Sequence, residues 1–316
     1  MIKKSNMCQI FLIACEIIII FFLSSMVYLS RPIATDSVIY LPKGTVGEII
    51  TYLKQRNSNI INIDKYILAT LGHPQSGWVD IKKQSLSKFD FLYALTTAKA
   101  AMSEITLIPG ETTAIFLQDM AKSLNLNEQI LNEIYDKVAP FGDGFFIPET
   151  YKIPIGIREK QLIYHLANLS KKRHQELSIK LLGKFDQKEW QKYLIIASII
   201  QKEAADESEM PIVSSVIYNR LKKGIKLQMD GTLNYGLYSH DTITAKRIRE
   251  DMSKFNTYLH DGLPPSPICS VSLAAIKAAV NPQESEFLYF VRDKKTMKHK
   301  FSKTYQEHSR IIDMQR

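Results

Sequence analysis

The chain has 316 residues, of which 45% are hydrophobic, and a formal net charge of +9 at pH 7; this is enough apolar material for roughly two domains. The positive charge favours an anionic neighbour, but no long basic run is interleaved with aromatic residues, which argues against nucleic acid as a partner. Three cysteines, without C-x-x-C or H-E-x-x-H spacing, exclude a disulfide framework and the commonest metal motifs.

Residues 8–29 form an apolar run that is long enough to cross a bilayer core of about 30 Å. Two lysines precede the run and none follows closely, which predicts a cytoplasmic N-terminus, residues 1–7, and a body outside the inner membrane. A cleaved signal peptide is one alternative, but the run exceeds the usual apolar region of about 7–15 residues. A lipoprotein signal at LIAC (12–15) is another, but it would leave the apolar segment EIIIIFFL as the mature N-terminus. We therefore expect a single retained transmembrane helix.

The next segment, residues 37–101, has the pattern of a small α/β subdomain. Its predicted order is strand, helix, helix, strand, which is the layout of LysM-type glycan-binding modules and also of ordinary structural subdomains. Thr45 and Glu48 have the spacing of a capping box at the start of the first helix. The predicted elements are strands over 37–42 and 75–83 and helices over 46–56, 63–72 and 89–101.

Residues 102–316 are predicted to form a larger mixed domain, so that the fold class of the whole chain is α+β. A strand and a Pro-Gly turn lead into a helix that either Thr112 or Thr113 caps. A β-hairpin is expected near the C-terminus, over 286–303. The other predicted helices cover 127–138, 158–182, 186–203, 211–224 and 272–282.

The stretch ASIIQKEA, residues 197–204, places a carboxylate on an apolar helix face. Glu203 lies seven, four and three residues after Ile196, Ile199 and Ile200, so all four share one face. A carboxyl held against apolar side chains loses hydration and its pKa rises, which suits a general acid for glycosidic bond cleavage. The alternative is a salt-bridged carboxylate near a helix end.

Two polar-aromatic loops follow, over residues 225–237 and 255–268. Their amides and tyrosines suit a carbohydrate cleft, because sugar hydroxyl and acetamido groups bond to amides and sugar rings stack on aromatic rings. Either loop, taken alone, is equally an ordinary structural turn.

Six motifs occur in order: ASIIQKEA, SSVIYNRLKKGIKLQMDGTLNYG, NTYLHDGLPPSPI, LAAIKAAVNP, LYFV and HKFSKTYQEHS. Together with the upstream segment GFFIPETY they resemble the endolytic murein transglycosylase, or YceG-like, family. The resemblance covers roughly residues 40–316. It implies a single membrane anchor, a LysM-like subdomain (37–101) and a catalytic domain (102–316) outside the membrane.

The resemblance also implies the activity and its acid. Such enzymes cleave the bond between N-acetylmuramic acid (MurNAc) and N-acetylglucosamine (GlcNAc) and leave anhydro-MurNAc ends. Glu203 falls at the second glutamate of the family's Glu-Lys-Glu, where Gln201 replaces the first. The chain also departs from the family at Gly231, where proline is usual, at Lys254-Phe255, and at Ser270-Val271-Ser272, where an Asn-Pro-Gly turn is common.

By this resemblance Glu203 acts first as acid and then as base, since the attacking C6 hydroxyl belongs to the substrate. Neither a cofactor nor a metal is implied. The expected partners are nascent glycan strands, the membrane and peptidoglycan synthases. Residues expected to contact sugar or to support the acid are Asn219, Gln228, Asp230, Thr232, Tyr235, Asn256, Tyr258, Glu149 and Tyr151.

Three other functions compete with this hypothesis. The chain is alternatively a non-catalytic, membrane-anchored scaffold that binds peptidoglycan, for which the carboxyl of Glu203 has no chemical role. A second alternative is a hydrolytic muramidase that uses Glu203 together with Asp230. The third, a nucleic-acid binder, rests on net charge alone.

Overall fold

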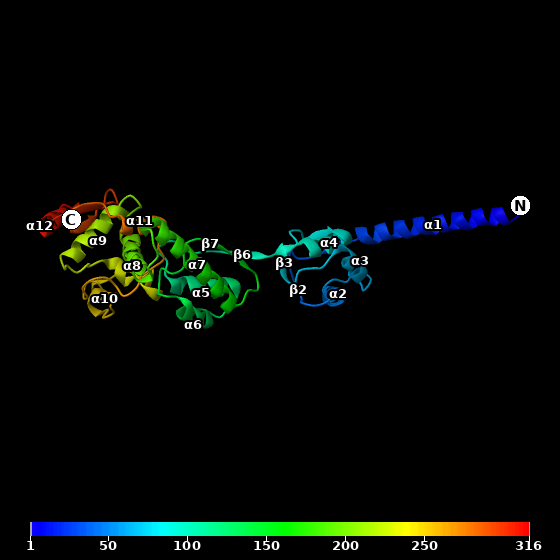
Figure 1. Ribbon diagram of the computed structural model, residues 1–316, viewed down its shortest axis with the longest axis horizontal. Helices are drawn as coiled ribbons and strands as arrows, with labels where there is room; N and C mark the ends of the chain where they lie inside the picture. The colour runs from blue at the N-terminus through cyan, green and yellow to red at the C-terminus, as the bar shows by residue number, and fades with distance from the viewer. Residues whose placement is uncertain (1, 316) are drawn as a thin grey trace. The chain divides into compact units, whose positions relative to one another are not determined.

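The computed structural model describes residues 2–315, with the side chains of residue 7 and residues 9–315. The chain folds into two compact units, and each contains helices and strands (Figure 1), which confirms the predicted α+β class. Unit 1 runs up to Ser103 and includes Pro154–Gly156, and unit 2 comprises Glu104–Ile153 and the chain from Ile157 onward. The predicted N-terminal segment 1–7 and domain 102–316 include Met1 and Arg316, which lie outside the described residues.

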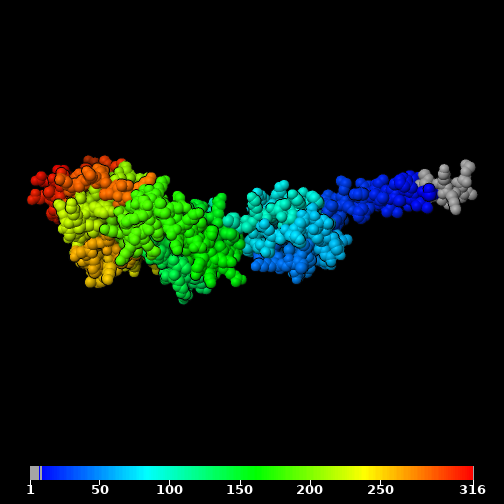
Figure 2. All heavy atoms as spheres, viewed as in Figure 1, coloured from blue at the N-terminus to red at the C-terminus, as the bar shows by residue number. Residues whose placement is uncertain are grey.

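The N-terminal helix α1, Ile2–Ser30, contains the predicted span 8–29. Within the described residues it is the one helix that is long and apolar enough to cross a membrane, over Gln9–Ser30. In its most apolar window no residue is fully buried by the rest of the protein (Figure 2). Length and composition are therefore compatible with a single-pass anchor.

The rest of unit 1 has the predicted order of strand, two helices and strand. Strand β2, Val38–Leu41, pairs antiparallel with β3, Gly77–Asp80, and the two helices between them bury Ile49, Ile50 and Leu68. The predicted capping box is present, because the Glu48 carboxylate accepts from the Thr45 backbone N–H at 2.7 Å. The helices are α2, Val46–Lys54, and α3, Asp64–Leu71, and a second small sheet pairs β1, Pro32–Ala34, with β4, Ser85–Ser87.

The predicted helix over 89–101 is too long. Helix α4 spans Lys88–Thr97, and the chain then extends into β5, Lys99–Ala100, which pairs with β3. Ala98 already has an extended backbone, with φ −61° and ψ 139°. Pairing with a strand about twenty residues away thus overrides the helix propensity of the alanines, which a local pattern does not reveal.

A buried ion pair holds three helices of unit 1 together. The Lys88 ammonium on α4 lies 3.3 Å from the Asp64 carboxylate on α3, and both side chains are almost fully buried. The Tyr28 hydroxyl on α1 donates to the other carboxylate oxygen of Asp64 at 2.6 Å. Because both charges are removed from water, losing one partner leaves the other unpaired in the interior.

We expect Lys88→Met to destabilise α3 and α4 by about 3 kcal/mol, since it leaves the Asp64 carboxylate buried without a cation. Amide hydrogen exchange of the full-length protein measures this as roughly 100-fold faster exchange in both helices. Lys83→Met is the control, because Lys83 is exposed. Equal protection in the two variants would contradict the assigned role of the pair.

Unit 2 is built around helix α8, Gln187–Glu203. This helix buries Trp190 and every residue from Leu194 to Ile200, and it packs against α9, α11 and the 3-10 turn η1 (Figure 1). The other helices and turns of the unit are α5 (Thr113–Leu124), α6 (Glu128–Val138), α7 (Glu159–Leu182), α9 (Met210–Lys222), η1 (Asp230–Leu233), η2 (Gly236–Tyr238), α10 (Ala245–Glu250), α11 (Leu273–Val280) and α12 (Tyr305–Asp313). Its strands are β8 (Tyr289–Arg292), β9 (His299–Ser302) and most of β6 (Met102–Thr106) and β7 (Thr150–Pro154), of which Met102, Ser103 and Pro154 belong to unit 1.

Most of the predicted elements of unit 2 are present. Thr112 rather than Thr113 caps α5, since its hydroxyl accepts from the Ile115 N–H. Helix α9 ends at Lys222, slightly before the predicted Gly224. Helices α10 and α12 were not predicted from the sequence, although α12 begins with a capping box formed by Thr304 and Glu307.

Candidate active site

The burial of α8 fixes the position of Glu203, its last residue. Ile196, Ile199 and Ile200 are fully buried, as the apolar stripe predicted, and they hold the helix end against the core. Ala204 then takes an extended conformation and ends the helix. The Glu203 side chain lines a cavity of about 440 Å³.

The surroundings of Glu203 raise the pKa of its carboxyl to about 7. Burial is the largest cause, because it disfavours the charged form, and the nearby Asp230 carboxylate adds to it. The Gly231 backbone N–H opposes both by donating to Glu203 Oε1 at 2.8 Å. Near pH 7 the carboxyl therefore exchanges readily between its acid and its carboxylate form.

The raised pKa makes stability depend on pH in a predictable direction. Folding disfavours the ionised Glu203, so its cost is absent below the unfolded pKa of about 4.3 and grows as pH rises to about 7. Glu203→Gln removes that cost. We expect the variant to gain up to about 3 kcal/mol over the parent between pH 4 and pH 8.

Urea unfolding followed by Trp190 fluorescence measures this effect, in a background where Trp78→Phe removes the second tryptophan. Trp190 is buried on the same helix as Glu203, so it reports unfolding at the site. The exposed Glu149→Gln is the matched control. A stability difference that does not change with pH would show that the pKa of Glu203 is not raised.

Gly231 approaches Glu203 closely because it has no side chain. A Cβ at this position would lie 2.6 Å from Lys202 Cβ and 3.0 Å from Glu203 Oε1. Proline, which is usual here in the family that the sequence resembles, has no N–H to donate. The hydrogen bond to Glu203 is thus a consequence of the glycine in this chain.

Two substitutions distinguish the effect of losing the Gly231 N–H from the effect of adding a side chain at this position. Gly231→Ala and Gly231→Pro both add a Cβ, but only proline removes the donor. We expect the pKa of Glu203 to be roughly one unit higher in the proline variant. The lower end of the pH range over which stability falls stays at the unfolded pKa, and its upper end, measured by the same unfolding assay, moves upward by that amount; coinciding upper ends would show that the N–H has no influence.

Three more of the predicted residues line the cavity with Glu203. These are Gln228, Asp230 and Tyr258. The Tyr258 hydroxyl donates to Asp230 Oδ1 at 2.7 Å, and burial together with this carboxylate raises the pKa of the Tyr258 hydroxyl. Gln228 has a left-handed backbone, with φ +49°, and its N–H donates to the Thr257 carbonyl, which joins the two loops at this point.

Three other predicted residues bond to the chain instead of facing this cavity. Thr232 is fully buried, and its hydroxyl donates to the Met229 carbonyl at 2.7 Å. The amide of Asn219 donates to two carbonyls of the segment before β8, those of Ser285 and Phe287. Asn256 is also fully buried, and its amide donates to the carbonyls of Ile248 and Asp251.

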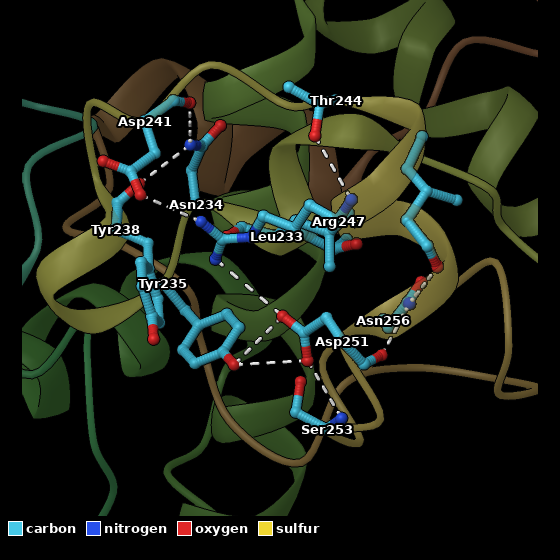
Figure 3. A network of polar contacts seen from close by, with 12 residues as sticks. Leu233, Asn234, Tyr235, Tyr238, Asp241, Thr244, Arg247, Asp251, Ser253 and Asn256 are labelled. Atoms are coloured by element: carbon cyan, nitrogen blue, oxygen red, sulfur yellow. Dashed lines mark hydrogen bonds and ion pairs between the residues drawn. The ribbon is translucent and has the colours of Figure 1, made fainter.

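Tyr235 belongs to a network of polar contacts that holds the segment between the two loops, residues 238–254, in place (Figure 3). Its hydroxyl donates to the Asp251 carboxylate at 3.2 Å, and its ring stacks on Phe255 with centroids 4.4 Å apart. Arg247 bonds to the Leu233 carbonyl at 2.6 Å and to the Asp241 carboxylate at 3.1 Å. The network keeps the loop folded back on itself.

Two further predicted residues lie at the start of β7, Glu149 just before the strand and Tyr151 within it. Glu149 is exposed, and its carbonyl accepts from the Leu107 N–H. Tyr151 is buried and donates to the Ile147 carbonyl. Neither lines the cavity of Glu203. A part in sugar binding stays a prediction for these two residues and for Asn219, Thr232, Tyr235 and Asn256.

The cavity has a second wall that the sequence analysis did not assign. It is formed by Arg220 of α9, Tyr289 of β8, and Tyr305 and His308 of α12. The last two belong to the motif HKFSKTYQEHS, so the signal was present, but it did not say which side chains face the acid.

Gln201 does not compete with Glu203 for the role of acid. Its side-chain carbonyl accepts from the Ser272 N–H at 3.0 Å, at the start of α11. Ser272 is the N-cap of α11, so Gln201, which departs from the family pattern, bonds to the residue that begins this helix. No group of three or more His, Cys, Asp or Glu residues suited to a metal is found among the described residues.

The model of the YceG-like family matches residues 39–314. This chain belongs to the YceG-like family. An endolytic murein transglycosylase of Bacillus subtilis is 38% identical over 120 residues, which are 38% of this chain and 33% of that protein. One of Streptococcus pneumoniae is 28% identical over 255 residues, which are 78% of this chain and 44% of that protein. The chain thus spans less than half the length of these relatives.

A solved structure shares the fold of the chain. It is a YceG-like protein of Listeria monocytogenes, with a TM-score of 0.56 and 23% sequence identity. The match covers 89% of this chain and 99% of that one. The resemblance drawn from the six sequence motifs is therefore confirmed at the level of family and of fold.

Proposed function

We propose that the chain is an endolytic lytic transglycosylase that cleaves the MurNAc–GlcNAc bond of nascent peptidoglycan strands and leaves anhydro-MurNAc ends, thereby terminating glycan elongation. The observation that carries the proposal is a single carboxyl, Glu203, with a pKa of about 7 on the wall of a cavity. The names of the curated relatives, endolytic murein transglycosylase, support the same activity.

In the proposed reaction, the protonated Glu203 gives its proton to the oxygen that bridges the two sugars. Because Oε1 accepts from the Gly231 N–H, the proton is transferred from Oε2. The positive charge that develops on the muramic sugar is met by the acetamido group of the same sugar. The Glu203 carboxylate then takes the proton of the muramic C6 hydroxyl, whose oxygen closes the anhydro ring.

Asp230 assists without exchanging a proton in this scheme. Its carboxylate is held by the Tyr258 hydroxyl, and its charge helps to keep Glu203 protonated. In the hydrolytic alternative, the Asp230 carboxylate also activates a water molecule. That alternative predicts reducing ends in place of anhydro ends.

The membrane arrangement forms part of the proposal. Helix α1 anchors the chain in the cytoplasmic membrane, and the lysines before it favour a cytoplasmic N-terminus and an extracytoplasmic body. From that position the site meets new strands as synthases release them. The LysM-like order of unit 1, residues 37–101, supports a glycan-binding role for that unit.

Mass spectrometry of glycan products tests the function directly. We expect the full-length protein in detergent to release anhydro-ended fragments from peptidoglycan strands, and Glu203→Gln to lower the rate by at least about 100-fold through loss of the acid. Glu133→Gln, which changes an exposed carboxylate on α6 with no expected contact to sugar, is the control.

Other products identify the competing functions. Reducing-end fragments from the parent protein would establish the muramidase, and equal cleavage by Glu203→Gln would exclude Glu203 as the acid. Strand binding without cleavage by either protein would establish the scaffold.

A further inference from the structure

The second wall of the cavity carries a cation that no acidic residue neutralises. The Arg220 side chain is 7% exposed and forms no ion pair with the carboxylates of the described residues. Its Nε donates to the Leu288 carbonyl at 2.6 Å, and Nη1 donates to the carbonyls of Lys226 and Leu227. Nη2 makes no hydrogen bond to any described residue. A guanidinium fixed in this way presents a free donor at no further cost in side-chain entropy.

An imidazole nitrogen that has no hydrogen-bond partner among the described residues lies on the same wall. The Nδ1 of His308 is buried and has no hydrogen-bond partner among the described residues. Burial first, and then the charge of Arg220, lower the pKa of His308, so the ring is neutral at pH 7 and carries one N–H and one acceptor nitrogen. A buried polar atom that is left unpaired is costly unless a ligand satisfies it.

Tyr289 connects these two groups. Its ring is stacked on His308 with centroids 5.4 Å apart, and the Arg220 guanidinium lies 5.0 Å from its centroid. Tyr305 packs edge-on against Tyr289 at 6.0 Å and remains 67% exposed at the rim. Tyr289 thus contacts both polar groups, and all three side chains line the cavity that also contains Glu203.

We propose that Arg220 and His308, oriented by Tyr289, form a subsite for the carboxyl-bearing branch of the muramic sugar. Arginine with a free N–H suits a carboxyl or acyl oxygen, and the imidazole that stacks on Tyr289 supplies a second hydrogen bond. GlcNAc has no such branch, so the subsite distinguishes the two sugars and sets which glycosidic oxygen faces Glu203. This inference rests on the proposed function for its substrate class.

The carboxyl chemistry has two sources in peptidoglycan. In strands stripped of stem peptides, the lactyl group of the muramic sugar carries a free carboxylate. In strands with stem peptides, that group is an amide, and the carboxylates lie further along the peptide. Both strand types are used as probes, because the same cation serves either source.

Equilibrium binding to the full-length protein in detergent tests the subsite, in a Glu203→Gln background so that no cleavage occurs. We expect Arg220→Lys and His308→Gln each to raise the Kd roughly tenfold. The His308 side chain makes no hydrogen bond to any described residue, so His308→Gln removes no side-chain hydrogen bond that holds the fold. The matched controls are Arg310→Lys and His165→Gln, which change exposed side chains of α12 and α7.

Each outcome is decisive. A larger loss with stripped strands supports the lactyl carboxylate as the bound group, and a loss confined to peptide-bearing strands supports a stem-peptide carboxylate. A Kd equal to that of the controls with both strand types would overturn the subsite. If the parent protein fails to cleave while both variants still lose binding, the subsite stands and the transglycosylase proposal fails.

Discussion

The position of one carboxyl depends on how deeply helix α8 is buried. Seven consecutive residues of α8, from Leu194 to Ile200, are inaccessible or nearly so, and α9 and α11 pack against them. A helix held in this way cannot rotate or slide without opening the core of unit 2, because protein interiors are close-packed. Glu203 lies three residues after the end of this segment on the same helix, so the same apolar contacts that stabilise the unit also fix the position of the acid.

The polar residues of the two loops complete the site from the other side. The backbone of Gln228 bonds to the Thr257 carbonyl, and the Met229 N–H bonds to the Thr257 hydroxyl at 3.1 Å. This joins the segment that carries Asp230 and Gly231 to the segment that carries Tyr258. Buried hydrogen bonds of this kind are costly to break, since each leaves a donor or an acceptor unsatisfied. The loops are therefore rigid where they meet the acid, although they contain no long helix or strand.

The sequence predicts the features of this arrangement that depend on residues close together in the chain, and it fails for those that depend on residues far apart in the chain. The apolar stripe before Glu203 is local, so its spacing was enough to predict both the buried face and the carboxyl at its end. Strand β5 was missed because its pairing with Val79 and Asp80 is not visible from Lys99 and Ala100 alone. The same limit applies to the cavity wall of Arg220 and His308, which are 88 positions apart and meet only after folding.

Composition also predicts the presence of polar side chains better than their direction. Asn256 and Thr232 lie in the loop segments where sugar contacts were expected, yet both side chains turn inward to bond with the chain. Gln228 and Tyr258, from the same two segments, line the cavity. The difference arises from which backbone carbonyls each turn leaves unpaired, and a residue type does not encode this.

Opposing effects of the surroundings give the Glu203 carboxyl a pKa near neutral pH, which the proposed mechanism requires. A carboxyl that must donate a proton and then recover one within the same turnover works best when its pKa lies near the surrounding pH. Burial and Asp230 raise the pKa, and the Gly231 N–H lowers it again, which gives a value of about 7. Burial alone would favour the acid but weaken the base, and the N–H alone would do the reverse. In this chain Asp230, which raises the pKa, and Gly231, which lowers it, are neighbouring residues of η1 next to the end of α8.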